Sequence, residues 1–409
     1  MPASDDSKKT ILITSGRAPV ALELARMFHR AGHRVIVAET LKRHLSSHSR
    51  CVSKNVRVSW PTKDPEKYQS EIAAIIEQEA VDLLLPTCEE ICYLSANNPS
   101  LKDPRYRWVP DWKQLHALHS KWEFVQLAGR LNLAVPKTRL VSNREELEQA
   151  YAEGAWGVFK PVYSRFASRA LINPASLDEL AEVTPTATAP WVAQQFLAGE
   201  QLSTFSLAWE GKLLAHVTYP MNFTTGIGPA YGYESVDQPA VRQWVAEFVA
   251  AENFSGQIAF DFIVQEAGAV AAIECNPRAT SGLHLFRSRT DLVDAYLWPA
   301  ETHQRLEGAG ECLQPNSRPA HHALPLLLWS LGYVRSWTRL KQFVRMLFRG
   351  RDVLLSWRDP WPILMVGFSL YPFFKRARQH SVSFDQATTM DIEWNEVPRP
   401  EEAAVAGSP

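Results

Sequence analysis

The segment from Gly256 to Arg278 constrains the fold more than any other part of the sequence. It reads GQIAFDFIV, then QEAG, then AVAAIECNPR, which predicts two strands joined by a short turn at Ala267 and Gly268. A turn centred there places Asp261 directly opposite Glu274, where like charges destabilise a sheet. We therefore expect a hard cation such as Mg²⁺, which prefers carboxylate oxygens, to compensate the pair.

Two further polar side chains follow on the second strand. Alternation places Asn276 on the same face as Glu274, and Arg278 comes two residues later. An amide oxygen adds a metal ligand, and a guanidinium group binds phosphate or carboxylate in a bidentate manner. Phe260 and Phe262 favour a buried hairpin over the other interpretation, an exposed sheet with scattered charges.

Two lysines supply the cations that a phosphate site needs. Lys160 ends the apolar strand predicted at Trp156–Pro161, and lysine is seldom buried without a partner. Lys121 opens a helix within Trp112–Leu131, a segment expected to form one or two helices. Each lysine alone is typical of a surface position. Together with the acidic hairpin they predict a nucleoside triphosphate held between lysines and magnesium.

The N-terminal part predicts a parallel sheet built from alternating strands and helices. The strands are expected at Ile11–Thr14, Arg34–Ala38 and Val81–Pro86, and the helices at Ala18–Ala31 and 66–80. The G-x-G-x-x-G fingerprint is absent, so the sequence favours a Rossmann-like domain in which Glu39 holds no dinucleotide ribose. Glu89 and Glu90 follow the third strand, where they either contact substrate or begin a solvated helix. From Trp191 a long run of strands is expected to reach Pro277, and helices are expected from Gln314 onward.

In order and spacing, Lys121, Lys160, Gln194–Glu200, Asp261 and the E-x-N-P-R run at Glu274–Arg278 resemble the ATP-grasp superfamily. The E-x-N-P-R run is similar to that of the carbamoyl-phosphate synthetase and biotin carboxylase branch. The resemblance covers about residues 9–300 and implies a chain of mixed α/β and α+β class. Its expected parts are a disordered tail (1–8), a Rossmann-like pre-ATP-grasp domain (9–115), two ATP-grasp subdomains (116–190 and 191–313), an added Trp- and Arg-rich helical region (314–395) and a second disordered tail (396–409).

The resemblance also implies a role for each matching position. Lys121 and Lys160 would contact ATP phosphates, and Arg278 would steady the transferred phosphoryl group. The adenine hinge would comprise Gln194, Gln195, Phe196 and Leu197. Asp261, Glu274 and Asn276 would hold one or two Mg²⁺ ions, for which Mn²⁺ is a substitute.

This sequence departs from the family pattern at two places. The family's glycine-rich loop is replaced by PVYSRFASR at 161–169, where Ser164 and Ser168 hydroxyls would stand in for backbone amides. The family's ribose-binding glutamate falls on Gln201, so the adjacent Glu200 is a second candidate for that contact.

The activity that the resemblance implies is ligation of a small-molecule carboxylate to an amine. ATP phosphorylates the carboxylate, ADP leaves, and the amine displaces phosphate from the acyl phosphate. Carboxy-phosphate or carbamoyl-phosphate chemistry on bicarbonate is one alternative, and an ATP-binding regulatory or scaffold protein is another. His284 is a candidate proton acceptor for the amine. Substrate contacts are expected from Thr224–Gly228, Thr280–His284 and the Glu89–Glu90 loop.

Charge narrows the range of partners. The formal net charge is −1, so nucleic-acid binding is not expected, whereas a homodimer is compatible with the sequence. Between Arg335 and Arg378, ten Lys and Arg residues against two Asp are interleaved with Trp, Leu and Phe. Three interpretations stay open for this segment: an interfacial helix on anionic lipid, a lid over substrate, or a helical cap with arginines facing water.

Cysteine usage and the termini indicate a cytoplasmic protein that is at most peripheral to a membrane. The five cysteines are an odd number, and the C-x₃-C pair of Cys88 and Cys92 lacks the second pair that a zinc site needs. The polar N-terminus lacks the apolar stretch of a signal peptide. The apolar stretch at 360–374 is shorter than the roughly 20 residues that span a bilayer.

Overall fold

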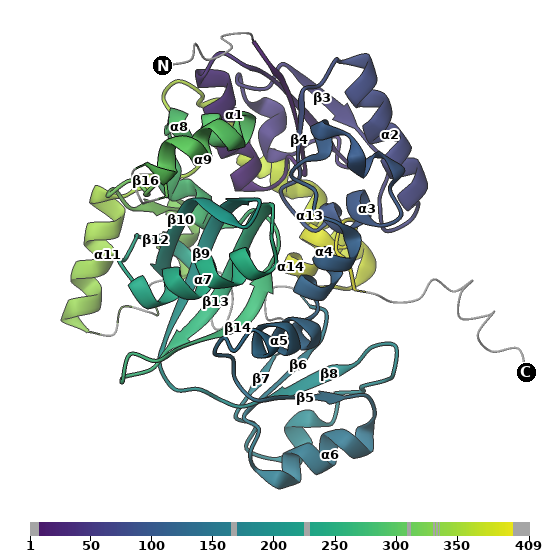
Figure 1. Ribbon diagram of the computed structural model, residues 1–409, viewed down its shortest axis with the longest axis vertical. Helices are drawn as coiled ribbons and strands as arrows, with labels where there is room; N and C mark the ends of the chain where they lie inside the picture. Colours follow the sequence, from purple (N-terminus) through teal and green to yellow (C-terminus); the bar gives the residue numbers. More distant parts are fainter. Residues whose placement is uncertain are drawn as a thin grey trace, which may run out of the picture.

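The computed structural model describes residues 8–164, 170–224, 230–308, 312–329, 332, 334 and 336–395. The expected tails fall outside these residues, apart from residue 8. Figure 1 shows the N-terminal sheet at one end, the subdomain that runs from β5 (Thr138–Val141) to β8 (Trp191–Gln194) at the other, and the central sheet with β9 (Glu200–Trp209) and β13 (Gly256–Val264) between them. The yellow C-terminal helices α13 (Val366–His380) and α14 (Phe384–Thr389) return to lie beside the N-terminal sheet (Figure 1).

The N-terminal sheet is parallel with strand order β3-β2-β1-β4, which confirms the predicted βαβ pattern. Its strands are β1 (Thr10–Thr14), β2 (Arg34–Glu39), β3 (Lys54–Arg57) and β4 (Leu83–Leu85). Its helices are α1 (Pro19–Arg30), α2 (Pro65–Gln78) and α3 (Glu90–Ser95), with short 3-10 turns η1 (Leu45–His48), η2 (Pro99–Lys102) and η3 (Pro104–Tyr106). Gly32 follows α1 with φ of +91°, as expected of a glycine after a helix.

The next part of the chain begins with two helices and continues into a small antiparallel sheet. Trp112–Leu131 forms α4 (Trp112–His119) and α5 (Lys121–Arg130), separated by Ser120, whose side chain caps α5. The sheet has the order β5-β8-β6-β7 and its own core. Its elements are β5 (Thr138–Val141), α6 (Arg144–Glu153), β6 (Val158–Pro161), β7 (Leu171–Ile172), η4 (Leu177–Leu180) and β8 (Trp191–Gln194).

The central sheet is antiparallel with the order β10-β9-β13-β14. Its strands are β9 (Glu200–Trp209), β10 (Lys212–Pro220), β13 (Gly256–Val264) and β14 (Val270–Asn276). The expectation of uninterrupted strands from Trp191 to Pro277 is wrong, because α7 (Pro239–Ala251) precedes β13. Proline at its first position and buried Val241, Trp244 and Phe248 at helical spacing explain α7.

The expectation of helices alone after Gln314 also needs correction. The short strands β15 (Ala320–His321) and β16 (Arg351–Asp352) extend β11 (Asn222–Thr224) and β12 (Ala230–Tyr233) into a four-stranded sheet. The remaining elements are helical: η5 (Ser281–Phe286), α8 (Thr290–Leu297), α9 (Pro299–Glu307), α10 (Ala323–Trp329), α11 (Trp337–Arg349), α12 (Trp361–Leu364), α13 (Val366–His380) and α14 (Phe384–Thr389). Within the described residues, no helix is both long and apolar enough to cross a membrane.

A buried ion cluster attaches the C-terminal helices to the carboxyl edge of the N-terminal sheet. Arg17, after β1, pairs with Glu39 at the end of β2 and with Asp391 at 2.6 Å. Arg376 of α13 reaches the same Asp391 at 2.9 Å. Glu39 occupies the position of a dinucleotide ribose acid, and the C-terminal segment covers it. This packing fixes the inner side of α13 and α14 on the N-terminal domain and does not decide between a helical cap and an interfacial helix, which differ in the outer side.

Candidate active site

The acidic hairpin forms with the predicted register around Asp261 and Glu274, but its register near the turn differs from the prediction. Asp261 pairs with Glu274, and Ala259 pairs with Asn276. Closer to the turn the register differs by one residue, because a bulge lies between the two halves of the hairpin and leaves Ile273 without a pairing partner. The bulge therefore brings Glu274, and not Ile273, opposite Asp261.

The environment of Asp261 disfavours its charged form. Burial, and after it the facing Glu274, raise the pKa of Asp261 to about 6, although a hydrogen bond from Ser203 opposes both effects. Ser203 lies opposite Asp261 on β9, the neighbouring strand on the other side. Two facing carboxylates with one raised pKa are the arrangement that a divalent cation relieves.

Lys121 reaches this pair from the start of α5. Its ammonium Nζ lies 3.8 Å from Glu274 Oε1 and donates to the carbonyl of Ser164 at 3.1 Å. Its side chain is only 5% exposed. Lys121 therefore connects the start of α5 to the phosphate-loop candidate and to the hairpin.

Lys160 lies at the end of β6, and its Nζ donates to the carbonyl of Ile273 at 3.1 Å. The carbonyl that accepts from Lys160 therefore belongs to Ile273, the unpaired residue of the bulge. The pKa of Lys160 is lowered to about 8, mainly by burial and also by Lys121, although Glu274 and Asp261 oppose the shift. A second cation therefore lies within the electrostatic reach of both carboxylates.

Arg278 connects the hairpin to the N-terminal sheet. Its guanidinium donates to Asn276 Oδ1 at 3.0 Å and lies 3.7 Å from Glu89 Oε1. Glu89 and Glu90 are both buried, so the interpretation as a solvated helix start is wrong. Glu90 instead accepts from the Thr14 hydroxyl at 2.5 Å and from nearby backbone amides, which fixes the loop after β4.

The hinge candidates lie at the end of β8. Gln194 is buried and its amide donates to Thr138 Oγ1 at 3.0 Å, while the backbone amide of Gln195 donates to the carbonyl of Lys137 at 2.8 Å. Phe196 is 44% exposed. Its Cβ would lie 2.6 Å from a Cβ placed on Gly157, so a side chain at Gly157 would displace the Phe196 ring.

The ribose candidates Glu200 and Gln201 begin β9 and are both exposed. They pair with Val264 and Ile263 near the hairpin turn. Ser164 is the last described residue of the phosphate-loop candidate; its carbonyl, rather than its hydroxyl, accepts from Lys121. The expected contributions of residues 165–169 and 225–228 lie outside the described residues.

His284 is placed differently from the other candidates. It is buried, with Nδ1 3.5 Å from Glu23 of α1, and its ring packs on Tyr233 and His322. The cations and carboxylates above are absent from these contacts. Because its contacts are with Glu23, Tyr233 and His322, the geometry favours a structural role for His284.

Three residues near the site were not identified from the sequence. Ser203 contacts Asp261, and the backbone amide of Trp394 donates to Glu89 Oε2 at 3.3 Å. The ring of His119 contacts the carbonyl of Trp394 at 3.0 Å. Burial lowers the pKa of His119, while Glu89 raises it. His119 immediately precedes Ser120, the cap of α5, and its position two residues before Lys121 is the only sequence signal that places it near the site.

The donor set fits a magnesium ion. It comprises the carboxylates of Asp261 and Glu274 and the amide oxygen of Asn276, which are hard oxygen ligands. The described residues contain no group of three or more His, Cys, Asp and Glu side chains arranged to hold a metal. Magnesium is commonly bound through one or two carboxylates, with water and substrate phosphate oxygens completing its coordination.

No family model matches the sequence, and no curated protein is significantly similar to it. Solved structures do match the fold. The N5-carboxyaminoimidazole synthetase of Staphylococcus aureus superimposes with a TM-score of 0.58 at 14% identity, over 81% of this chain and 88% of that chain.

Two further solved structures also match the fold. The L-amino acid ligase of Bacillus licheniformis gives a TM-score of 0.55 at 14% identity, covering 71% of this chain and 74% of that chain. The biotin carboxylase domain of the Hydrogenobacter thermophilus 2-oxoglutarate carboxylase, in complex with MgADP, ADP and bicarbonate, gives 0.54 at 12% identity over 76% and 71%. The fold of this chain is therefore the ATP-grasp fold, of the biotin carboxylase-like kind.

Proposed function

We propose that the protein is an ATP- and Mg²⁺-dependent ligase that joins a carboxylate to an amine and releases ADP and phosphate. The observation that carries this proposal is the convergence of Lys121 and Lys160 on the facing carboxylates Asp261 and Glu274. Phosphoryl transfer needs positioning and charge neutralisation more than covalent help from the protein, and this site supplies both signs of charge.

The proposed roles follow the positions of the side chains. Lys121 and Lys160 bind ATP phosphates, and Asp261, Glu274 and Asn276 hold one or two Mg²⁺ ions, or Mn²⁺ in their place. The backbone of Gln195–Leu197 receives adenine, and Glu200 or Gln201 contacts the ribose. The bound metal would neutralise charge on the phosphate oxygens.

The proposed reaction has two bond exchanges. A carboxylate oxygen of the acid attacks the γ-phosphorus of ATP, and the bond to the ADP oxygen breaks. The amine nitrogen then attacks the carbonyl carbon of the acyl phosphate, inorganic phosphate leaves, and the nitrogen loses a proton to solvent or a nearby base. Arg278, beside Asn276 and Glu89, is placed to steady the phosphoryl group that both steps share.

We propose the following domain division: residues 9–115 as the pre-ATP-grasp domain, 116–190 and 191–313 as the ATP-grasp subdomains, and 314–395 as an addition. The four sheets support it, and the small antiparallel sheet has a core of its own, whereas one shared core joins Ile11, Phe205 and Ala320 of the other parts. We also propose a cytoplasmic location, since all five cysteines are free and four of them are buried.

The test is ADP release across a panel of carboxylic acids and amines, with Glu274→Gln as the inactive variant. Glu266→Gln, which changes an exposed carboxylate in the turn of the same hairpin, is the matched control. We expect turnover with one acid and amine pair in wild type and Glu266→Gln, and a loss of at least about 100-fold in Glu274→Gln. Formation of AMP and pyrophosphate would contradict the proposal, and the absence of turnover with every pair would favour a regulatory or scaffold role.

Bicarbonate is the second candidate for the acid. The similarity to a biotin carboxylase domain in complex with MgADP and bicarbonate favours it. The same assay in bicarbonate-depleted buffer separates the two candidates. ADP release that depends on added bicarbonate and needs no organic acid would assign carboxy-phosphate chemistry.

A further inference from the structure

The exposed apolar side chains of this protein are concentrated in its C-terminal region. Of the fifteen large apolar side chains that are exposed among the described residues, thirteen lie between Leu324 and Phe374. Scattered exposed apolar residues are ordinary on a protein surface, but their collection in one segment marks an interaction site.

Helices α12 and α13 form the most regular part of this region. Trp361, Leu364, Phe368, Tyr371 and Phe374 recur at helical spacing, and each is 45–66% exposed. We call these five residues and Trp357, which is 89% exposed in the preceding loop, the apolar face.

The opposite side of α13 points inward and includes polar groups. Its buried residues are Ser369, Phe373 and Arg376, and Arg376 is held by Asp391 and lies over the ring of Trp60. The orientation of α13 is therefore fixed by buried ionic contacts, with its apolar side directed outward. A helix that packs on a core in water normally has the reverse arrangement.

The charges around the apolar face are positive. Between Asp359 and Asp385 the sequence contains no acidic residue, and Lys375 and Arg378 at the end of α13 are exposed. Basic residues beside aromatic and aliphatic side chains are typical of helices that lie in the interface of an anionic bilayer.

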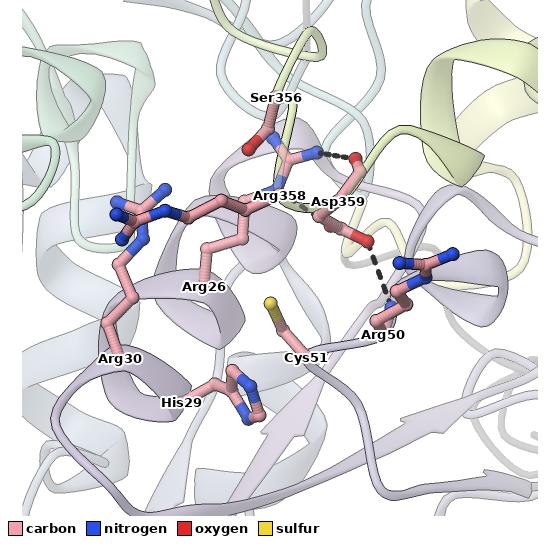
Figure 2. Close-up of a pocket in the computed structure, with 8 residues that line it drawn as sticks. All are labelled: Arg26, His29, Arg30, Arg50, Cys51, Ser356, Arg358 and Asp359. Carbon is pink, nitrogen blue, oxygen red and sulfur yellow. Dashed lines mark hydrogen bonds and ion pairs between the residues drawn. The ribbon is translucent and has the colours of Figure 1, made fainter.

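A pocket of about 320 Å³ adjoins the Trp357 end of the apolar face. Figure 2 shows its lining, which comes from α1, the Arg50 loop and the segment around Trp357. The lining residues are Arg26, His29, Arg30, Arg50, Cys51, Ser356, Arg358 and Asp359.

The pocket has excess positive charge. Asp359 is engaged by Arg26 at 2.9 Å and accepts from the backbone amide of Arg50 at 2.9 Å, as the dashed contacts in Figure 2 indicate. Among the described residues, no carboxylate forms an ion pair with Arg30, Arg50 or Arg358. Three exposed guanidinium groups at one pocket suit the phosphate of a lipid headgroup.

We propose that the apolar face binds the surface of an anionic phospholipid bilayer, with headgroup phosphates at the pocket formed by Arg30, Arg50 and Arg358. The positive charge around the apolar face favours an anionic bilayer over a second copy of the chain as its partner. A symmetric contact through this face would bring its own cations together, whereas an anionic bilayer complements them. The protein then binds at the membrane interface without crossing it.

The test is co-sedimentation of the full chain with vesicles of phosphatidylcholine alone and of an equimolar mixture with phosphatidylglycerol. We expect binding to the mixture that weakens as salt is added, and little binding to phosphatidylcholine. Trp357→Ala with Phe368→Ala should lower the partition coefficient at least about tenfold. The matched control is Ile172→Ala, which truncates an exposed apolar residue of the small antiparallel sheet.

A second pair of variants tests the charge. Arg50→Gln with Arg358→Gln should weaken binding and flatten its salt dependence, whereas Lys102→Gln, at an exposed site of the N-terminal domain, should not. Unchanged melting temperatures verify folding, and Tyr371→Ala replaces Phe368→Ala if that variant is unstable.

Three results would overturn the proposal. They are failure of the wild type to bind either vesicle, equal binding by wild type and both variant pairs, and a concentration-dependent dimer that the apolar-face variants dissociate. None of these measurements depends on ligase activity, so the proposed reaction and the membrane surface can fail separately.

Discussion

At the scale of single residues, the facing carboxylates of Asp261 and Glu274 form an unfavourable charge pair. The raised pKa of Asp261, about 6, means that the folded protein binds this proton more tightly than the unfolded chain does. Ionisation of Asp261 therefore lowers stability as the pH rises through about 6. Asp261→Asn should stabilise the ligand-free protein at about pH 8 by on the order of 1–3 kcal/mol and should abolish stabilisation by MgADP.

Urea unfolding near pH 5 and pH 8, with and without MgADP, measures this effect. Glu266→Gln changes an exposed carboxylate of the same hairpin and should leave both stabilities unchanged. A destabilised Asp261→Asn at both pH values would mean that the carboxylate supports the fold and that its repulsion with Glu274 is minor.

Lys160 gives the site a second pH dependence. Its pKa, lowered to about 8 by burial, means that the free protein loses this positive charge as the pH rises through 8. The affinity for ADP should therefore fall at higher pH, by up to about tenfold per unit. Lys160→Arg keeps the charge, so its affinity should be flat between about pH 7 and pH 9. Titration calorimetry measures both profiles, and equal slopes in the two proteins would assign the effect to another group.

At the scale of elements, the buried cluster at Asp391 anchors the C-terminal helices. Arg17 and Arg376 both pair with it, and Arg17 holds its pKa well below the ordinary carboxyl range. The ionised carboxylate of Asp391 therefore stabilises the fold above the ordinary pKa of aspartate, and this contribution is lost as the pH falls below that value. Asp391→Ala leaves two buried guanidinium groups undercompensated and should cost about 3–5 kcal/mol, or release α13 and α14 to proteolysis. The exposed Asp385→Ala in α14 is the matched control, and equal stability of the two variants would contradict the anchoring role.

Patterns within one element were predictable, and contacts between distant elements were not. Alternation and a short turn predicted that Asp261 faces Glu274, but the bulge at Ile273 that keeps them opposed has no marker in the sequence. Strand β3 was missed because its residues are polar and mostly exposed. The pairing of Arg17 with Asp391 spans 374 residues, and no local pattern identifies it. For the same reason, the sequence did not predict that the C-terminal segment covers Glu39.

At the scale of the whole molecule, the site joins two parts that have separate cores. Lys160 comes from the small sheet, whose core includes Val141, Phe159 and Trp191. The carboxylates come from the central sheet, whose core lies around Phe248 and Phe260. Between these parts, the contact from Lys160 Nζ to the Ile273 carbonyl lies at the site itself.

Nucleotide should therefore stabilise the two parts jointly. MgADP bound between Lys160 and the Asp261–Glu274 pair adds ionic contacts from both sheets to one ligand, so opening of the small sheet would also require ligand release. We expect hydrogen exchange in β6 and β8 to slow at least about tenfold with saturating MgADP in wild type and in Glu266→Gln. In Glu274→Gln the protection should be largely lost, since the metal contact on the central sheet is weakened while Lys160 is intact. Equal protection in wild type and Glu274→Gln would show that the nucleotide binds the small sheet alone, and the coupling of the two parts would then be rejected.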